Sequence, residues 1–220
     1  MDSPLSIQGL LADDALPADA VDERILDAAL EQFALVGIRR TSADDIARRA
    51  SVNRTTLYRR MGTKEQIVRS AVLHETRRIL TQVAAAIQGI DDVSERITQG
   101  FVVSITILRG NPLFRQVLAS EREDTLVWLT IDAGETLKIA TTFVAAQIRR
   151  AWSDRGLPDD ANAEPIAAIL VRLVHSLILT PDAPPDLHST EQLRTFALSY
   201  IRPLIDGGTA ASLCEMDGSK

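Results

Sequence analysis

Basic side chains gather in one short segment of the chain. Residues 37–64 hold eight arginine and lysine residues and two acidic ones, a net charge of +6, whereas the whole 220-residue chain carries −6. The rest of the chain must therefore carry −12. Guanidinium and ammonium groups bind phosphates, so a basic segment on an acidic body predicts a polyanionic partner for one region of the protein. The eight cations are Arg39, Arg40, Arg48, Arg49, Arg54, Arg59, Arg60 and Lys64.

The apolar residues of this segment have the spacing of a helix-turn-helix. Ile46, Ala47 and Ala50 form an apolar patch on a first short helix. Leu57, ten residues after Ala47, would fill the core from a second short helix, and Ser51 falls in the tight turn between them. Two helices joined by such a turn form the corner that places a reading helix in the DNA major groove.

The second short helix carries the groups that contact DNA. When Leu57 faces the core, a helical wheel turns the opposite face outward. That face carries two guanidinium groups, a hydroxyl and a phenol, which contact phosphates and base edges, and Asn53 can cap the helix so that its free amides also face outward. The alternative is a solvated arginine-rich helix face, but the spacing, the turn and the charge contrast agree in favour of DNA binding. The outward residues are Arg54, Thr55, Tyr58 and Arg59.

These residues resemble the DNA-binding domain of the TetR family of transcriptional repressors. The resemblance covers about residues 20–70 and rests on 33-FALVGIRRTS-42, 45-DIARRASVNRTTLYRRM-61 and the Thr63-Lys64-Glu65 start of the next helix. Beyond it, the chain agrees with the family only in length and helix count. The resemblance implies phosphate contacts from Thr41 or Ser42, Tyr58 and Lys64, and base or backbone contacts from Arg54, Thr55 and Thr56.

The chain departs from the family pattern at two positions. The turn usually holds glycine where this chain has Ser51, so a left-handed conformation there would cost about 1 kcal/mol. Met61 replaces the usual aromatic residue before the next helix and can fill the same space less rigidly. Both departures bear on stability more than on DNA contacts.

Helical periodicity and capping residues predict an all-α fold of about nine helices. The first runs from Asp19 to Gly37, the segment 41–60 gives two short helices, and others are expected over 64–88, 92–109, 111–118, 121–154, 163–180 and 189–205. We expect a flexible N-terminal arm (1–18), a helix-turn-helix DNA-binding domain (19–66), a helical ligand-binding and dimerisation domain (67–206) and a disordered tail (207–220).

The last two predicted helices suggest a homodimer. Helix 163–180 is apolar nearly all round and needs burial on more than one side. The TetR resemblance implies that helices 163–180 and 189–205 meet their symmetry mates in a four-helix interface, although a core helix of a monomer would show the same pattern. The predicted interface residues are Ile166, Leu170, Leu173, Leu177, Phe196 and Tyr200.

The helices between 64 and 154 are expected to enclose a small-molecule effector, although any one of their apolar residues could equally be ordinary core. Effector binding would shift the protein to a conformation whose reading helices are wrongly spaced for a palindromic operator in double-stranded DNA, with helix 64–88 as the lever. The candidate lining residues are Phe101, Ile105, Phe114, Trp128, Ile131, Phe143 and Gln147.

Composition limits the other function classes. One cysteine, Cys214, allows no intrachain disulfide, and the chain shows no signal peptide and no apolar run that could span a bilayer, so we expect a soluble protein of the reducing cytoplasm. The three histidines are far apart and lack metal-ligand spacing, and no cofactor motif is present. An enzyme is disfavoured because no catalytic triad or phosphate loop can be read; a helical adaptor that uses the basic segment on an acidic protein is the other alternative.

Overall fold

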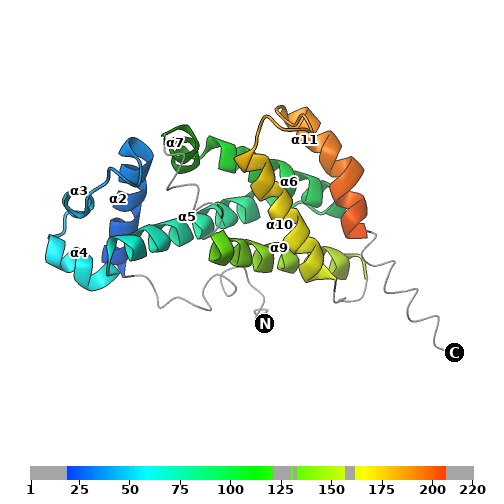
Figure 1. Ribbon diagram of the computed structural model, residues 1–220. Coiled ribbons are helices and arrows are strands. Elements are labelled where there is room, and N and C mark those ends of the chain that lie inside the picture. Colours follow the sequence, from blue (N-terminus) through cyan, green and yellow to red (C-terminus); the bar gives the residue numbers. More distant parts are fainter. Residues whose placement is uncertain (1–18, 121–129, 131–132, 157–161, 207–220) are drawn as a thin grey trace. The chain divides into compact units, whose positions relative to one another are not determined.

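The computed structural model describes residues 19–120, 130, 133–156 and 162–206. Within these ranges the secondary structure is helical and includes nine α-helices (Figure 1), which confirms the predicted all-α fold. The chain forms two compact units. Met1–Ile79 and Leu108–Thr136 contribute to unit one, and Leu80–Ile107 and Leu137–Lys220 contribute to unit two.

Unit one contains four complete helices, α2 (Ala20–Val36), α3 (Ala43–Arg49), α4 (Arg54–Met61) and α7 (Pro112–Ser120), and the larger part of α5 (Lys64–Ile87). Helix α2 contacts α3, α4 and α7. The helices begin where side chains satisfy the first free amides: Asn53 accepts from the amide of Thr56 at 2.7 Å, and Thr63 and Gln66 cap α5 reciprocally.

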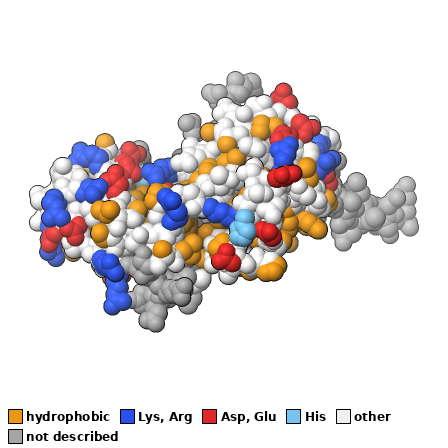
Figure 2. Space-filling model, turned by 90° about the horizontal axis from the view of Figure 1, so that it is seen from above, with side chains coloured by type: hydrophobic (Ala, Val, Ile, Leu, Met, Phe, Trp, Pro, Cys, Tyr) orange, Lys and Arg blue, Asp and Glu red, His pale blue; other side chains and the backbone are white. Residues whose placement is uncertain are grey.

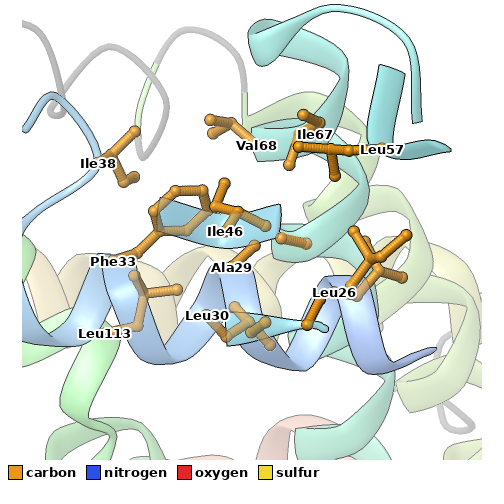
Figure 3. Packing of buried hydrophobic residues seen from close by; sticks show 14 of the residues in the cluster. Leu26, Ala29, Leu30, Phe33, Ile38, Ile46, Leu57, Ile67, Val68 and Leu113 are labelled. Carbon is orange, nitrogen blue, oxygen red and sulfur yellow. The ribbon is translucent and has the colours of Figure 1, made fainter. Parts of the chain in front are cut away.

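One hydrophobic cluster holds unit one together (Figure 3). Phe33 of α2, Ile46 of α3, Leu57 of α4 and Ile67 of α5 are all completely buried in it. Leu113 of α7 joins the same cluster, although it lies more than forty residues after the helix-turn-helix. Helices α3 and α4 are too short to be stable alone, so the burial of their apolar residues in this cluster holds them in place and sets the angle between them.

Unit two contains most of α6 (Val93–Gly110) and of α9 (Gly134–Asp154). It also contains α10 (Ala163–Leu179) and α11 (Thr190–Phe196), which continues as a π-helical turn, η2 (Ala197–Ile201). Trp152 is completely buried and donates its indole N–H to the carbonyl of Ile205 at 3.2 Å. Arg194 pairs with Glu95 at 2.8 Å and so ties α11 to α6.

One predicted helix begins elsewhere. A continuous helix over 121–154 was expected, but Thr130 lies in a turn and α9 begins at Gly134. Glycine costs about 1 kcal/mol in a helix interior and far less at an end, which explains why the helix begins there rather than running through it. Residues 121–129 of that prediction lie outside the described residues. Of the helices in the described ranges, none combines the length and apolar character that crossing a bilayer requires.

Candidate nucleic-acid interface

Helix α4 presents its polar face to solvent because Leu57 anchors its other face. Leu57 is completely buried, as is Ile46 of α3, against which the corner closes. Arg54, Thr55 and Arg59 are exposed, and so is Tyr58 at 38%. The orientation expected from the helical wheel is thus confirmed. Thr56, the remaining predicted contact on this helix, is half-buried.

The turn between α3 and α4 adopts the strained conformation that the sequence suggested. Ser51 has φ 54°, the one left-handed non-glycine residue of the described chain. Its amide donates to the carbonyl of Arg48 at 3.2 Å, and the amide of Val52 donates to Ala47 at 3.0 Å. This tight turn sets the start of α4, where Asn53 caps the helix and leaves Arg54 as its first residue.

The residues before α3 differ in their access to solvent. Thr41 is 1% exposed, and its hydroxyl donates to the carbonyl of Gly37 at 2.8 Å. Ser42 is exposed and caps α3 reciprocally with Asp45. The Ser42 hydroxyl holds the pKa of the Asp45 carboxyl below its usual value, together with the backbone amide of Ser42 and, less strongly, Arg48. Of the two alternatives for a phosphate contact before α3, Thr41 and Ser42, Ser42 is therefore the accessible one.

Lys64 lies at the first position of α5, where it interacts electrostatically with Glu65 and hydrogen-bonds a neutral backbone group. Its ammonium group donates to the backbone carbonyl of Arg39 at 3.2 Å. This hydrogen bond holds the ammonium beside the segment that leads into α3 without neutralising it. The arrangement leaves the charge of Lys64 available for an anion such as a DNA phosphate.

Several of the basic side chains form ion pairs, and some of their partners come from outside the basic segment. Figure 2 shows the result as blue and red side chains lying next to each other on the left of the view. The net charge of +6 counted over residues 37–64 does not include the carboxylates at and within α2, which precede this segment in the sequence but lie next to its arginines in the fold. The pairs are Arg48 with Asp45 at 2.5 Å, Arg49 with Glu31 at 2.5 Å, Arg54 with Asp44 at 3.0 Å, and Arg60 with Asp19 and Asp22 at 2.9 Å each.

The predicted effector residues fall in different parts of the chain. In unit two, Phe101, Ile105 and Phe143 are buried and Gln147 is half-buried. Phe114 belongs to unit one and is half-buried. Trp128 and Ile131 lie outside the described residues. An effector site at these residues stays a prediction.

The predicted dimer residues divide by exposure. Ile166, Leu170 and Leu177 are buried in the single chain, and Leu173 and Phe196 are half-buried. Tyr200 is 64% exposed. Three large apolar residues that were not among the predicted contacts are also exposed. The interface stays a prediction. The exposed apolar residues of this region are Tyr200 and three others, with exposed fractions of 54% for Ile169, 40% for Leu198 and 36% for Leu204.

Comparison with known proteins identifies both halves of the chain. Residues 25–71 match the model of bacterial regulatory proteins of the tetR family, and residues 92–198 match that of the bacterial tetracyclin repressor C-terminal domain. An uncharacterized HTH-type transcriptional regulator of Mycobacterium tuberculosis, Rv1255c, is 23% identical over 86% of this chain and 88% of its own length.

Solved structures of regulators share the fold. The TetR family repressor AlkX of Dietzia sp. strain DQ12-45-1b, implicated in biodegradation of n-alkanes, superposes with a TM-score of 0.66 at 19% identity, over 87% of this chain and 98% of that one. The regulator FadR of Bacillus subtilis in complex with stearoyl-CoA has a TM-score of 0.56 at 18% identity, over 84% and 98%. With two models of one family matching most of its length and a helix-turn-helix whose reading face is open to solvent, the chain belongs to the TetR family of DNA-binding transcriptional regulators.

Proposed function

We propose that the protein is a homodimeric repressor that binds a palindromic operator in double-stranded DNA and is released by a small, lipophilic effector. One observation supports the DNA-binding part above all. The helix that buries Leu57 leaves Arg54, Thr55 and Tyr58 together on its open face, at its first turns. The N-terminal residues of a reading helix are those that reach base edges in the major groove.

The remaining contacts follow from the same geometry. Ser42 and Lys64 would bind phosphates on either side of the groove and fix the register, with Tyr58 adding a hydroxyl. Asn53 and the free amides at the start of α4 would add a favourable dipole for a phosphate. Arg54, Thr55, Thr56 and Arg59 would meet bases or backbone. Thr41 would act indirectly, because its hydroxyl closes the turn before α3.

A dimer is proposed because one reading helix makes few base contacts. Two copies related by a two-fold axis would read two half-sites one helical turn, about 34–36 Å, apart, or a multiple of it. The exposed apolar residues of α10 and of the helix that follows it, including Ile169 and Tyr200, are the surface we assign to this contact. A regulator that binds operator DNA works in the cytoplasm of a bacterial cell, where we therefore expect it.

A lipophilic effector is proposed from the apolar residues of unit two and from what the structural neighbours of the chain bind or regulate. Phe101, Ile105 and Phe143 are apolar and lie on α6 and α9. Among the structural neighbours, one regulator is implicated in biodegradation of n-alkanes and another holds stearoyl-CoA. Helix α5 contributes residues to both units, so it is the element through which effector and operator would oppose each other's binding reciprocally.

Selection from random duplex DNA tests the proposal directly. Fragments retained by the full chain should share a palindrome, and Arg54→Ala should weaken binding to it by about 1–3 kcal/mol. Retained fragments without a common sequence would contradict a sequence-specific regulator. Full affinity after Arg54, Thr55 and Tyr58 are all changed to Ala would show that α4 does not read DNA. An operator complex that no acyl or alkyl compound dissociates would remove the effector from the proposal.

A further inference from the structure

Arg54 is held between two groups that come from different helices of the corner. Its Nη1 donates to Asp44 of α3, at 3.0 Å from Oδ2 and 3.3 Å from Oδ1. Its guanidinium carbon lies 5.4 Å from the centre of the Tyr58 ring, one turn along α4. A hydrogen bond to Tyr58 and, after it, the charge of Asp44 raise the pKa of the guanidinium.

The position of Asp44 distinguishes it from the other carboxylates that pair with arginines. Glu31 and Asp22 lie on α2 and tie α3 and α4 to that helix. Asp44 instead links the two helices of the corner at the first residue of α4, with its side chain 63% exposed. An ion pair this exposed contributes little to folding, and a carboxylate on a DNA-binding surface repels phosphates. Its place in the first turn of α3 favours that helix through the dipole, and its contact with Arg54 is the ground for assigning it a role in binding as well.

The hydrogen-bonding pattern of the pair indicates that role. A guanidinium group has five N–H donors in a rigid fork, and Asp44 occupies Nη1. Asp44 uses Nη1 alone, and a hydrogen bond to Tyr58 takes up a further donor. Among the other donors, two parallel N–H groups would match O6 and N7 of guanine. The Asp44 carboxylate would also repel a phosphate that approached Arg54. The phosphate and the carboxylate would then lie closer together than the Debye length of about 8 Å, so salt would not screen their repulsion fully.

We propose that Asp44 is a specificity-determining positioning residue, which orients Arg54 toward a guanine in the major groove and disfavours its use as a phosphate contact. The inference rests on the proposed function, since it assigns one base contact within the operator. It predicts that one position of each half-site is a guanine whose preference depends on both Asp44 and Arg54.

The test compares three variants with the wild-type chain on the selected operator and on each single-base replacement of it. Arg54→Ala should remove the preference for guanine at one position, about 5- to 150-fold. Asp44→Asn should lower the preference at that same position about two- to fivefold, as expected for the loss of an exposed ion pair, and should raise the affinity for unrelated DNA. Glu31→Gln is the matched control: it removes the carboxylate that pairs with Arg49 and should leave the base preference at every position unchanged.

The outcomes separate this inference from the proposed function. If the wild-type protein selects no common sequence, both the proposed function and the role of Asp44 are contradicted. A wild-type preference that Asp44→Asn leaves intact, or a uniform change of affinity at all positions, would overturn the role of Asp44 alone. Thermal unfolding shows whether Asp44→Asn folds. If it does not, Asp44→Ser takes its place with the same expected loss of preference at that position, and an unchanged preference would overturn the inference.

Discussion

At the scale of single residues, Lys64 and Arg49 show why equal charges need not contribute equally to DNA binding. The ammonium of Lys64 donates to a backbone carbonyl at 3.2 Å, whereas Arg49 pairs with Glu31 at 2.5 Å. A cation that contacts a phosphate releases a counterion, but a cation already neutralised by a carboxylate adds less to the field that holds those ions.

Alanine substitutions at these two residues should therefore change the salt dependence differently. Lys64→Ala should lower the slope of log affinity against log salt by about one, and Arg49→Ala by clearly less. Titrations of operator DNA between low and physiological salt give both slopes. An unchanged slope for Lys64→Ala would show that Lys64 makes no phosphate contact, and equal losses would show that the ion pair with Glu31 opens on DNA.

The turn residue Ser51 offers a prediction on stability. Its φ of 54° costs a residue with a Cβ about 1 kcal/mol. Ser51→Gly should remove that cost and stabilise the protein by several tenths of a kcal/mol, because the greater freedom of glycine in the unfolded chain offsets part of the gain. Chemical denaturation measures the difference. Ser51→Ala is the control, since alanine keeps the strain. If Ser51→Gly were instead less stable than Ser51→Ala by about 0.4–1 kcal/mol, the unfolded-state cost of glycine alone, the turn would carry no strain.

At the scale of helices, the sequence predicted local features and missed long-range ones. The reciprocal caps at Thr63 and Ser189 were predictable because both partners lie within four residues of each other. The packing of Leu113 beside Phe33 was not, because nothing in the periodicity of α7 names the helix that it meets. The same limit hid the carboxylates of α2 that pair with the basic segment. The reading face of α4 was predictable because one buried residue, Leu57, fixes the orientation of a whole short helix.

Asn111 shows how a cap can also join two helices. Its Oδ1 accepts from the amide of Leu113 at 2.9 Å at the start of α7, and its Nδ2 donates to Glu75 of α5, which is 3% exposed. Arg78 also pairs with Glu75, at 2.8 Å. Removing the Asn111 amide would take from a buried carboxylate one of its hydrogen-bond donors, which is more costly than the loss of an exposed cap.

Two helix-capping asparagines of unit one, Asn111 and Asn53, allow the costs of losing a buried and an exposed cap to be compared. Asn111→Ala should cost about 2–4 kcal/mol of unfolding free energy, the sum of the cap and of the uncompensated carboxylate. Asn53→Ala, which removes an exposed cap with a single amide partner, should cost about 1 kcal/mol. Denaturant unfolding of both variants measures the gap, and equal losses would show that water replaces the Asn111 amide at Glu75.

At the scale of the whole molecule, the proposed function would depend on pairing two chains, because the affinity for a palindromic operator would combine two half-sites that each bind weakly. Ile169 and Tyr200 are more than half exposed on α10 and on the π-helical turn after α11, although both are large and apolar. Burying the exposed half of such a side chain favours association by about 1 kcal/mol, half of what full burial contributes. A glutamate in their place would put a charge into the contact and oppose it.

Ile169→Glu and Tyr200→Glu, each made alone, should therefore turn the proposed dimer into a monomer without unfolding the chain. Sedimentation velocity at micromolar concentration should show half the mass of the wild type. Affinity for the full operator should fall by at least tenfold while affinity for an isolated half-site stays the same. Leu35→Glu is the control, because Leu35 is 64% exposed on α2, outside the proposed contact, and its variant should keep the wild-type mass. A monomeric wild type would instead support the alternative that α10 is a core helix of a single chain, and a dimeric Tyr200→Glu would move the contact to another surface.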